Sequence, residues 1–295
     1  MTELIQSLVR GLGNGSVYAL LAFGFVIIYK SMGVISFAQP SFMLAGAVLV
    51  TYLVSGLNFY LAVLVAMILV AALAVGVERA VIRPMIGKPV FVISIITLGV
   101  DVVVRVVVNV YIGLDVRQVG APWGLSLTPL FGTEVQVRYL VMFGTTMVLV
   151  AVLFAFFRFS RMGLAMRAAA FDQEVALAQG VSVGSVFMLS WAIAGALAAV
   201  AGVFVSTGAG VDQLLWIIAL KALPVIILGG LDSLGGAVIA GLLIGTVESL
   251  VGTYGVHVAP WMGGEFSLVT PYLVMMIVLL VRPFGLFGTR EVVRI

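Results

Sequence analysis

Four charged residues stand inside otherwise apolar stretches, and their side chains are the best placed in this sequence to do chemistry. Asp101 and Arg105 are four residues apart, which puts them on one face of a helix, where they can pair. Lys221 and Glu248 lie in two later apolar stretches and could pair across helices. A charge inside a bilayer costs roughly 2.5–3.5 kcal/mol on insertion scales, so such residues are usually paired or functional.

Each of these two pairs of charged residues has more than one interpretation. For Asp101 and Arg105 we predict a structural ion pair, with a gating or pathway role as the alternative. Lys221 could snorkel toward a lipid headgroup, and Glu248 could be hydrated near a helix end. Alternatively, Lys221 and Glu248 could bind the carboxylate and amino groups of a zwitterionic solute.

Other chemistries are excluded by what the chain lacks. It contains no cysteine and one histidine, His257, so thiol catalysis, zinc–thiolate sites and histidine metal clusters are ruled out. The phosphate-binding pattern G-x-x-x-x-G-K-[ST] does not occur anywhere in the sequence. We therefore expect no catalytic residue, no metal and no cofactor in this chain. A membrane-embedded enzyme would need a nucleophile and a base, or a metal site, brought together in space, and the sequence offers no such set.

The composition decides what surrounds these charges. The chain has 295 residues, of which 63% are hydrophobic and 9% charged, and its mean hydropathy is +1.29. Soluble domains carry roughly 25% charged residues. The sequence therefore predicts an all-α, polytopic transmembrane bundle formed by one domain, residues 1–295. No cleaved signal peptide is expected at its N-terminus.

Apolar stretches long enough for membrane crossing recur along the chain. A spanning helix needs about 20 mainly apolar residues. The predicted spans are 12–29, 40–56, 58–77, 90–111, 138–157, 186–208, 214–230, 236–252 and 268–286. This gives nine crossings, or eight if the stretch near 31–56 or the short 214–230 enters the membrane and returns on the same side.

Basic residues fall mainly on one side of this scheme. That side has ten: Lys30, Arg79, Arg83, Lys88, Arg158, Arg161, Arg167, Arg282, Arg290 and Arg294. The opposite side has three: Arg10, Arg117 and Arg138. The positive-inside rule predicts an external N-terminus and a cytoplasmic C-terminus. Residues 112–137 then form the main external loop, whose Pro, Gly and Thr content suits turns or a short hairpin.

A polar segment, about 161–185, separates two apolar stretches on the cytoplasmic side. Good helix formers predict a helix over Gly163–Gln179, and Gly180 is a natural stop. Its apolar residues recur at spacings of three and four on one face. They are Leu164, Ala168, Phe171, Val175 and Ala178. The helix is either an interfacial connection between two spans or a docking helix for a soluble partner.

This segment resembles the coupling segment of ABC-transporter permeases, in which a Glu-Ala-Ala pattern precedes a glycine. Glu174, Val175 and Ala176 match that pattern with Gly180 after them, although Val175 replaces the first alanine. Residues 11–47, 190–205 and 221–250 resemble other parts of the high-affinity branched-chain amino-acid permeases, the LivH/LivM type, in the same order. The resemblance covers much of the chain.

The resemblance implies the membrane subunit of an ABC importer in the plasma (inner) membrane of a prokaryote. A second permease, identical or homologous, would share the translocation path. Two ATPase subunits would bind ATP and Mg, and an external binding protein would deliver the solute. The implied ATPase-coupling residues are Arg167, Asp172, Gln173, Glu174, Ala176 and Gly180. Candidate residues of the translocation path are Asn14, Tyr18, Ser36, Phe37, Gln39, Lys221 and Glu248.

The implied solute is a branched-chain or other amino acid. The family often reads Asn-Phe-Ala-His-Gly where this chain has residues 36–40, Ser-Phe-Ala-Gln-Pro, and this departure concerns the substrate rather than the fold. Urea, short amides and small organic acids stay open as substrates. An ion-gradient-driven secondary transporter is the alternative, and it would not need the coupling segment.

Gly241 and Gly245 form a G-x-x-x-G pattern that predicts close helix packing.

Overall fold

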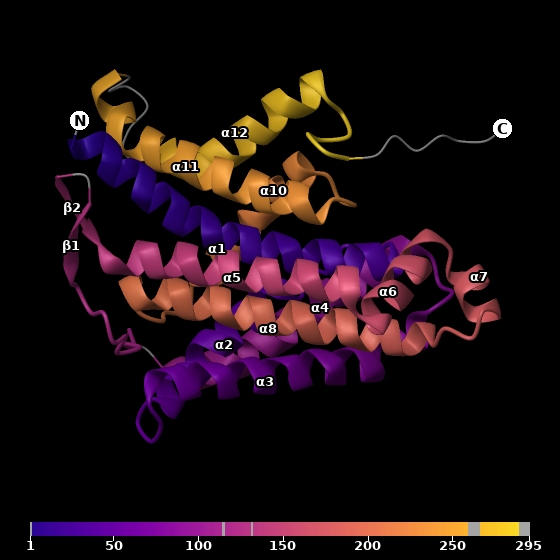
Figure 1. Ribbon diagram of the computed structural model, residues 1–295. Coiled ribbons are helices and arrows are strands. Elements are labelled where there is room, and N and C mark those ends of the chain that lie inside the picture. The colour runs from indigo at the N-terminus through magenta and orange to yellow at the C-terminus, as the bar shows by residue number, and fades with distance from the viewer. Residues whose placement is uncertain (1, 114–115, 131, 259–265, 289–295) are drawn as a thin grey trace.

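The computed structural model describes residues 2–113, 116–130, 132–258 and 266–288, which form a predominantly helical protein (Figure 1). Of the predicted cytoplasmic charges, Arg290 and Arg294 lie outside the described residues. The helices and strands are α1 (Thr2–Met32), α2 (Gln39–Leu53), α3 (Phe59–Val77), α4 (Val90–Ile112), β1 (Leu127–Leu130), β2 (Thr133–Gln136), α5 (Val137–Phe159), α6 (Arg161–Phe171), α7 (Gln173–Ala178), α8 (Val183–Ala209), α9 (Ile217–Leu220), α10 (Ala222–Gly229), α11 (Leu234–Val258) and α12 (Phe266–Val281).

Each predicted span overlaps a helix, but span 214–230 is divided between α9 and α10, and the helix in span 268–286 ends at Val281. Among the described residues, six helices are long and apolar enough to cross a membrane, and three apolar helices are shorter. The short ones are α2, the α9–α10 pair and α12. The turn-rich segment before α5 contains an antiparallel hairpin of β1 and β2, in which Thr128 lies opposite Val135.

Helices α1 and α8 form the centre of the bundle. In the most apolar stretch of α1, 89% of the residues are buried, and in α8 the share is 72%. In α4 and α5 it is 17%, so their apolar side chains point mainly away from the protein. Such an outward-facing apolar surface fits lipid as the surrounding solvent.

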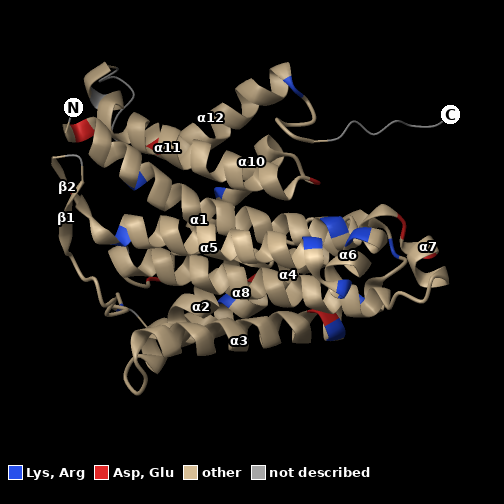
Figure 2. Cartoon of the chain, viewed as in Figure 1, with Lys and Arg blue, Asp and Glu red and all other residues tan. Residues whose placement is uncertain are grey.

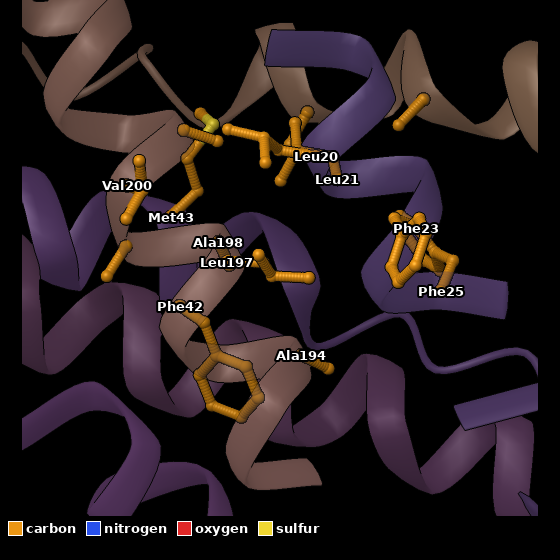
Figure 3. Close-up of a cluster of buried hydrophobic side chains, with 14 of the residues drawn as sticks. Leu20, Leu21, Phe23, Phe25, Phe42, Met43, Ala194, Leu197, Ala198 and Val200 are labelled. Carbon is orange, nitrogen blue, oxygen red and sulfur yellow. The ribbon is translucent and has the colours of Figure 1, made fainter. Parts of the chain in front are cut away.

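Helix α2 begins inside the bundle rather than at its end. The side chain of Gln39, at its first position, lies beside Gly24, about two turns before the end of α1. Phe42 and Met43 then pack among α1 and α8 side chains in the core (Figure 3). Small residues permit this approach, because a Cβ on Gly46 would lie 2.6 Å from the Cβ of Ala199.

Glycines also bring α1 and α11 together. A Cβ on Gly241 would lie 2.6 Å from the backbone N of Ala19, and a Cβ on Gly245 would lie 2.7 Å from the backbone O of Gly11. Gly15 faces both of these positions in α11. The two helices therefore touch backbone to backbone, as G-x-x-x-G patterns permit.

Basic side chains gather at one end of the bundle, beside α6 and α7, and we call it the basic end (Figure 2). The N-terminus and the β1–β2 hairpin lie at the opposite end, the hairpin end (Figure 1). The residues that define the basic end are Lys30, Arg83, Arg158, Arg161 and Arg167.

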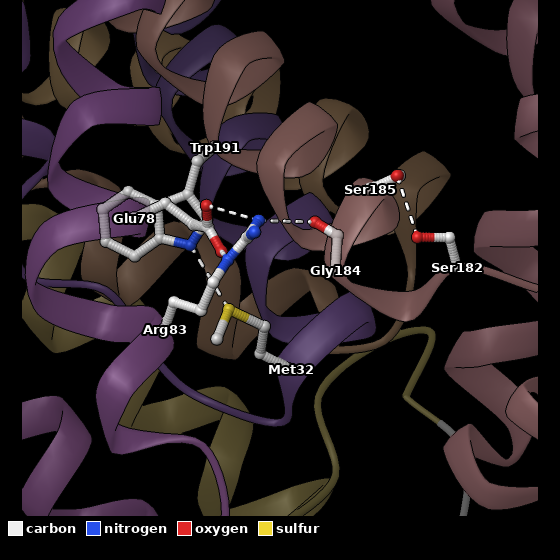
Figure 4. Close-up of polar contacts among 7 residues, drawn as sticks. All are labelled: Met32, Glu78, Arg83, Ser182, Gly184, Ser185 and Trp191. Atoms are coloured by element: carbon white, nitrogen blue, oxygen red, sulfur yellow. Dashed lines mark hydrogen bonds and ion pairs between the residues drawn. The ribbon is translucent and has the colours of Figure 1, made fainter.

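An arginine that forms an ion pair in the segment after α3 also hydrogen-bonds to α8 at the basic end (Figure 4). After α3 the chain continues through a π-helical turn, Glu78–Ile82. The Arg83 guanidinium donates to both carboxylate oxygens of Glu78, each at 3.0 Å, and to the Gly184 carbonyl at 3.0 Å. Glu78 is fully buried, so its charge depends on this partner.

Replacing Arg83 by alanine is expected to lower the free energy of unfolding by about 1–3 kcal/mol. A fully buried pair that loses one partner costs roughly 3–5 kcal/mol, and Arg83, whose side chain is 36% exposed, warrants a smaller value. The thermal unfolding midpoint of the purified protein measures the effect. Arg79→Ala, at a neighbouring exposed position, is the matched control. Equal midpoints for the two variants would contradict the role of the pair.

Candidate functional site: the α6–α7 segment and the α1–α11 cavity

The polar segment at the basic end forms two helices, which corrects the prediction of one helix over Gly163–Gln179. The chain turns extended at Asp172, with φ −156° and ψ 114°, between α6 and α7. The Asp172 carboxylate accepts the N–H groups of Glu174 and Val175 at 2.9 and 3.0 Å. Aspartate is a preferred N-cap, and this local capping competes successfully with continuous helix.

The predicted stop at Gly180 has a clear geometry. Its φ is +81°, a left-handed conformation that favours glycine. The Gly180 N–H donates to Leu177 and the Val181 N–H donates to Ala176, which ends α7.

The apolar face predicted for this segment is exposed. Phe171 is 95% exposed, and Leu164 and Val175 are exposed by more than half. Leu177, which the periodicity did not single out, is similarly exposed. The buried side of the segment is formed by Gly163, Met166, Ala169 and Ala176. Contiguous exposed apolar side chains at the end of a protein mark a contact surface.

Two hydrogen bonds connect this segment to the spans. Arg167 donates to the backbone carbonyl of Phe157 in α5. The Gln173 side chain donates to the carbonyl of Ser31, at the end of α1, at 3.0 Å. Glu174 is exposed on the first turn of α7. Movement of α7 would therefore act directly on α1.

The loop before α2, with Ser36 and Phe37, and the first turn of α2, which begins at Gln39, are held by α4. The Phe37 N–H donates to Thr97 Oγ1 at 2.9 Å, and the Ser41 N–H donates to Asp101 Oδ1 at 2.9 Å. Ser36 and Gln39 are fully buried. These three candidate path residues lie in the packed start of α2 and do not line the cavity described below.

Asp101 and Arg105 form an ion pair, with 3.2 Å between Oδ2 and Nη2. Arg105 also lies over the ring of Trp216, with Cζ 3.8 Å from its centroid. Asp101 therefore caps the start of α2 while Arg105 contacts the segment before α9. The pair thus connects α4 to α2 and to the segment before α9.

A cavity of about 400 Å³ contains the other four candidate path residues, Asn14, Tyr18, Lys221 and Glu248. Lys221 forms an ion pair with Glu248, and the Tyr18 hydroxyl donates to Glu248 Oε2 at 2.7 Å. The remaining lining residues are Val17, Arg138, Met142, Val205, Gly208 and Ile218.

Arg138 is the charged residue of the cavity that is absent from the candidates predicted from the sequence. It was counted only as an external charge, because it stands at the start of an apolar stretch. Its approach to α1, α8 and α11 depends on tertiary packing, which has no local signal in the sequence.

Replacing Lys221 by methionine is expected to lower the free energy of unfolding by about 2–3 kcal/mol. The substitution leaves the Glu248 carboxylate, which is 14% exposed, without its cation. Removing one partner of a fully buried ion pair costs roughly 3–5 kcal/mol of stability, and the cost is smaller here because the pair faces an open cavity. Adding Glu248→Gln should recover most of the thermal unfolding midpoint. A double variant no more stable than Lys221→Met would show that the two charges are not coupled.

Comparison with known proteins supplies a context for this arrangement. Residues 7–279 match the family described as "Branched-chain amino acid transport system / permease component". The chain is 29% identical to the high-affinity branched-chain amino acid transport system permease protein LivH of Escherichia coli K12, covering 99% of this chain and 97% of that protein. It is 30% identical to BraD, the corresponding permease protein of Pseudomonas aeruginosa, over 99% and 98%.

Two more distant similarities extend the comparison. The fructose import permease protein FruF of Bifidobacterium longum is 24% identical over 86% of this chain and 72% of that protein. Among solved structures, PsaBC from Streptococcus pneumoniae in complex with Fab matches with a TM-score of 0.53 and 15% identity, covering 96% of this chain and 93% of that one. The latter supports the fold alone.

Proposed function

Because this chain belongs to the family of branched-chain amino acid transport system permease components, we propose that it is the membrane-spanning subunit of an ABC importer. It would form a translocation path together with a second permease, identical or homologous. Two ATPase subunits would supply ATP and Mg, and an external binding protein would deliver the solute. This chain itself would hold neither cofactor nor metal.

The observation that carries this proposal is the exposed apolar surface of α6 and α7. Phe171 is 95% exposed, and Val175 and Leu177 are exposed by more than half, so none of them packs into the bundle. An amphipathic helix of this kind fits a groove in a partner protein. An ATPase subunit is the partner that an importer of this family would need there.

The contacts of α7 suggest how the partner's movement would reach the path. Gln173 contacts the end of α1, and α1 carries Asn14 and Tyr18 into the cavity. Closure of the ATPase pair would displace α7, and α1 would transmit the displacement to the cavity wall. We propose Arg167, Asp172, Glu174, Ala176 and Gly180 as further coupling residues, because they hold or shape this segment.

The proposed orientation places the basic end in the cytoplasm, as the positive-inside rule requires. The N-terminus and the hairpin would then be external, where a binding protein would dock, and the C-terminus would be cytoplasmic. The membrane would be the inner membrane of a prokaryote.

The proposed solute is a branched-chain or other amino acid. LivH and BraD support this by their names and by similarity over nearly the whole chain. The name of FruF refers to fructose, so the wider group of relatives has more than one type of substrate. Urea, amides and small organic acids are the alternative solutes of this proposal.

Co-purification tests the proposed assembly. The tagged wild-type chain is isolated from its native host in mild detergent beside Glu174→Lys, and the accompanying chains are identified by mass spectrometry. We expect ATPases and a permease with the wild type, and loss of the ATPases alone with the variant. A wild-type chain that purifies without ATPase subunits would contradict the proposal.

A further inference from the structure

The charges around the α1–α11 cavity leave one cation without a counter-ion. Lys221 is paired with Glu248, which also accepts the Tyr18 hydroxyl. Within the described part of the chain, Arg138 has no ion-pair partner, and its buried Nε atom has no hydrogen-bond partner. A buried guanidinium N–H that lacks an acceptor is costly, and a ligand with an acceptor group in the cavity would remove that cost.

Packing fixes Arg138 at the cavity wall. Its Cζ lies 4.6 Å from the centroid of the Tyr139 ring, so the guanidinium rests on an aromatic face. Gly208 of α8 also lies against the guanidinium, and a Cβ at this position would overlap Nη1 and Cζ of Arg138. The absence of a side chain at Gly208 thus makes room for the guanidinium beside the cavity.

The cavity also has an apolar wall, formed by Val17, Met142, Val205 and Ile218. Its volume of about 400 Å³ lies within the roughly 300–1,000 Å³ typical of small-molecule sites. An unpaired cation beside apolar side chains suits a ligand with a negative group and an aliphatic body.

We propose that Arg138 binds the carboxylate of an aliphatic solute in this cavity. The planar guanidinium can hold a carboxylate by two parallel hydrogen bonds, which Lys221, already neutralised by Glu248, cannot do. This inference rests on the proposed function, because it takes the ligand of the cavity to be the transported solute. It narrows the solute to a carboxylate and makes urea and neutral amides poor ligands of this site.

Cysteine labelling tests the proposal directly, because the chain has no cysteine of its own. Val205→Cys places one thiol in the cavity wall, and the rate of its reaction with a small maleimide is measured on the full-length chain, with its co-purifying subunits, in nanodiscs. The ligands are L-leucine, isovalerate and leucinamide, in which an amide replaces the carboxylate. A bound ligand slows labelling by the factor 1 + [L]/Kd, about threefold at twice Kd.

We expect leucine and isovalerate to slow labelling and leucinamide to have little effect. Adding Arg138→Gln should abolish the protection, and Arg138→Lys should retain part of it. Arg10→Gln removes an exposed positive charge from α1, whereas Arg138 belongs to α5, and this variant should leave the protection by each ligand unchanged. Thermal unfolding midpoints establish that each variant is folded.

Three results would overturn the inference: equal protection by leucine and leucinamide, no protection by either carboxylate, or full protection in the Arg138→Gln background. ATP-driven leucine uptake by the same preparation separates this inference from the proposed function. Uptake without carboxylate protection contradicts the Arg138 site alone. Protection without ATPase partners or uptake contradicts the importer and leaves the site intact.

Discussion

Replacing Phe171 by aspartate is expected to abolish ATP-driven uptake, with a loss of at least about 100-fold in the affinity of the ATPase subunit for the permease. Phe171 is 95% exposed at the end of α6, and its neighbours Val175 and Leu177 are exposed beside it. Aromatic residues that fill a partner's pocket are typical hot spots, whose truncation costs 2 kcal/mol or more. A carboxylate in the same pocket would also be desolvated without a partner. Binding of the purified ATPase to the permease in nanodiscs measures the effect.

Leu125→Asp is the matched control for Phe171→Asp. Leu125 is 86% exposed in the segment before β1, at the hairpin end of the molecule. The control introduces the same charge at an equally exposed apolar position, so its ATPase affinity should equal that of the wild type. Unchanged ATPase binding by Phe171→Asp would show that the α6–α7 surface is not the docking site.

The second large effect is expected at the contact between α1 and α11. Gly245→Val should lower the free energy of unfolding by more than about 4 kcal/mol and prevent recovery of folded protein. Even a single Cβ at this position would lie 2.7 Å from the Gly11 carbonyl oxygen, and the backbone of Gly15 is also in contact. The helices would have to separate. Overpacking of this kind is among the few single substitutions that destabilise a protein by more than about 4 kcal/mol. Size-exclusion chromatography in detergent and the thermal unfolding midpoint measure this.

Gly252→Val in the same helix separates this effect from the replacement of glycine as such. Among the residues that the structure describes, a Cβ there would meet the Ser267 side chain alone, at 3.5 Å, an ordinary van der Waals distance. We expect a folded protein with an unfolding midpoint near that of the wild type. Equal behaviour of the two variants would mean that close α1–α11 packing does not hold the bundle together.

The sequence was sufficient to predict the helices but not how each of them is used. Apolar runs specify helix in lipid because the backbone has no other way to satisfy its hydrogen bonds. The same runs did not indicate that α2 starts inside the bundle. This start depends on Thr97 and Asp101 of α4, a helix that is distant in sequence but adjacent in the fold. The break at Asp172 was missed because residues on both sides are good helix formers, although aspartate is itself a capping signal.

Predictions of contacts succeeded where the partners are close in sequence. Asp101 and Arg105 pair within one helix, so their spacing was enough. Lys221 and Glu248 also pair, but this possibility could only be named as one of several. The surroundings of Arg138 come from α1, α5, α8, α9 and α11, which meet around the cavity, and no periodicity in the sequence predicts that meeting.

ATP-driven uptake is the most direct test of the central claim. The complete transporter is reconstituted in proteoliposomes with labelled leucine and its binding protein outside, and either ATP inside or an imposed proton or sodium gradient. The account predicts uptake that requires enclosed ATP and is insensitive to both gradients. Uptake driven by a gradient in the absence of ATP would contradict it and would identify a secondary transporter instead.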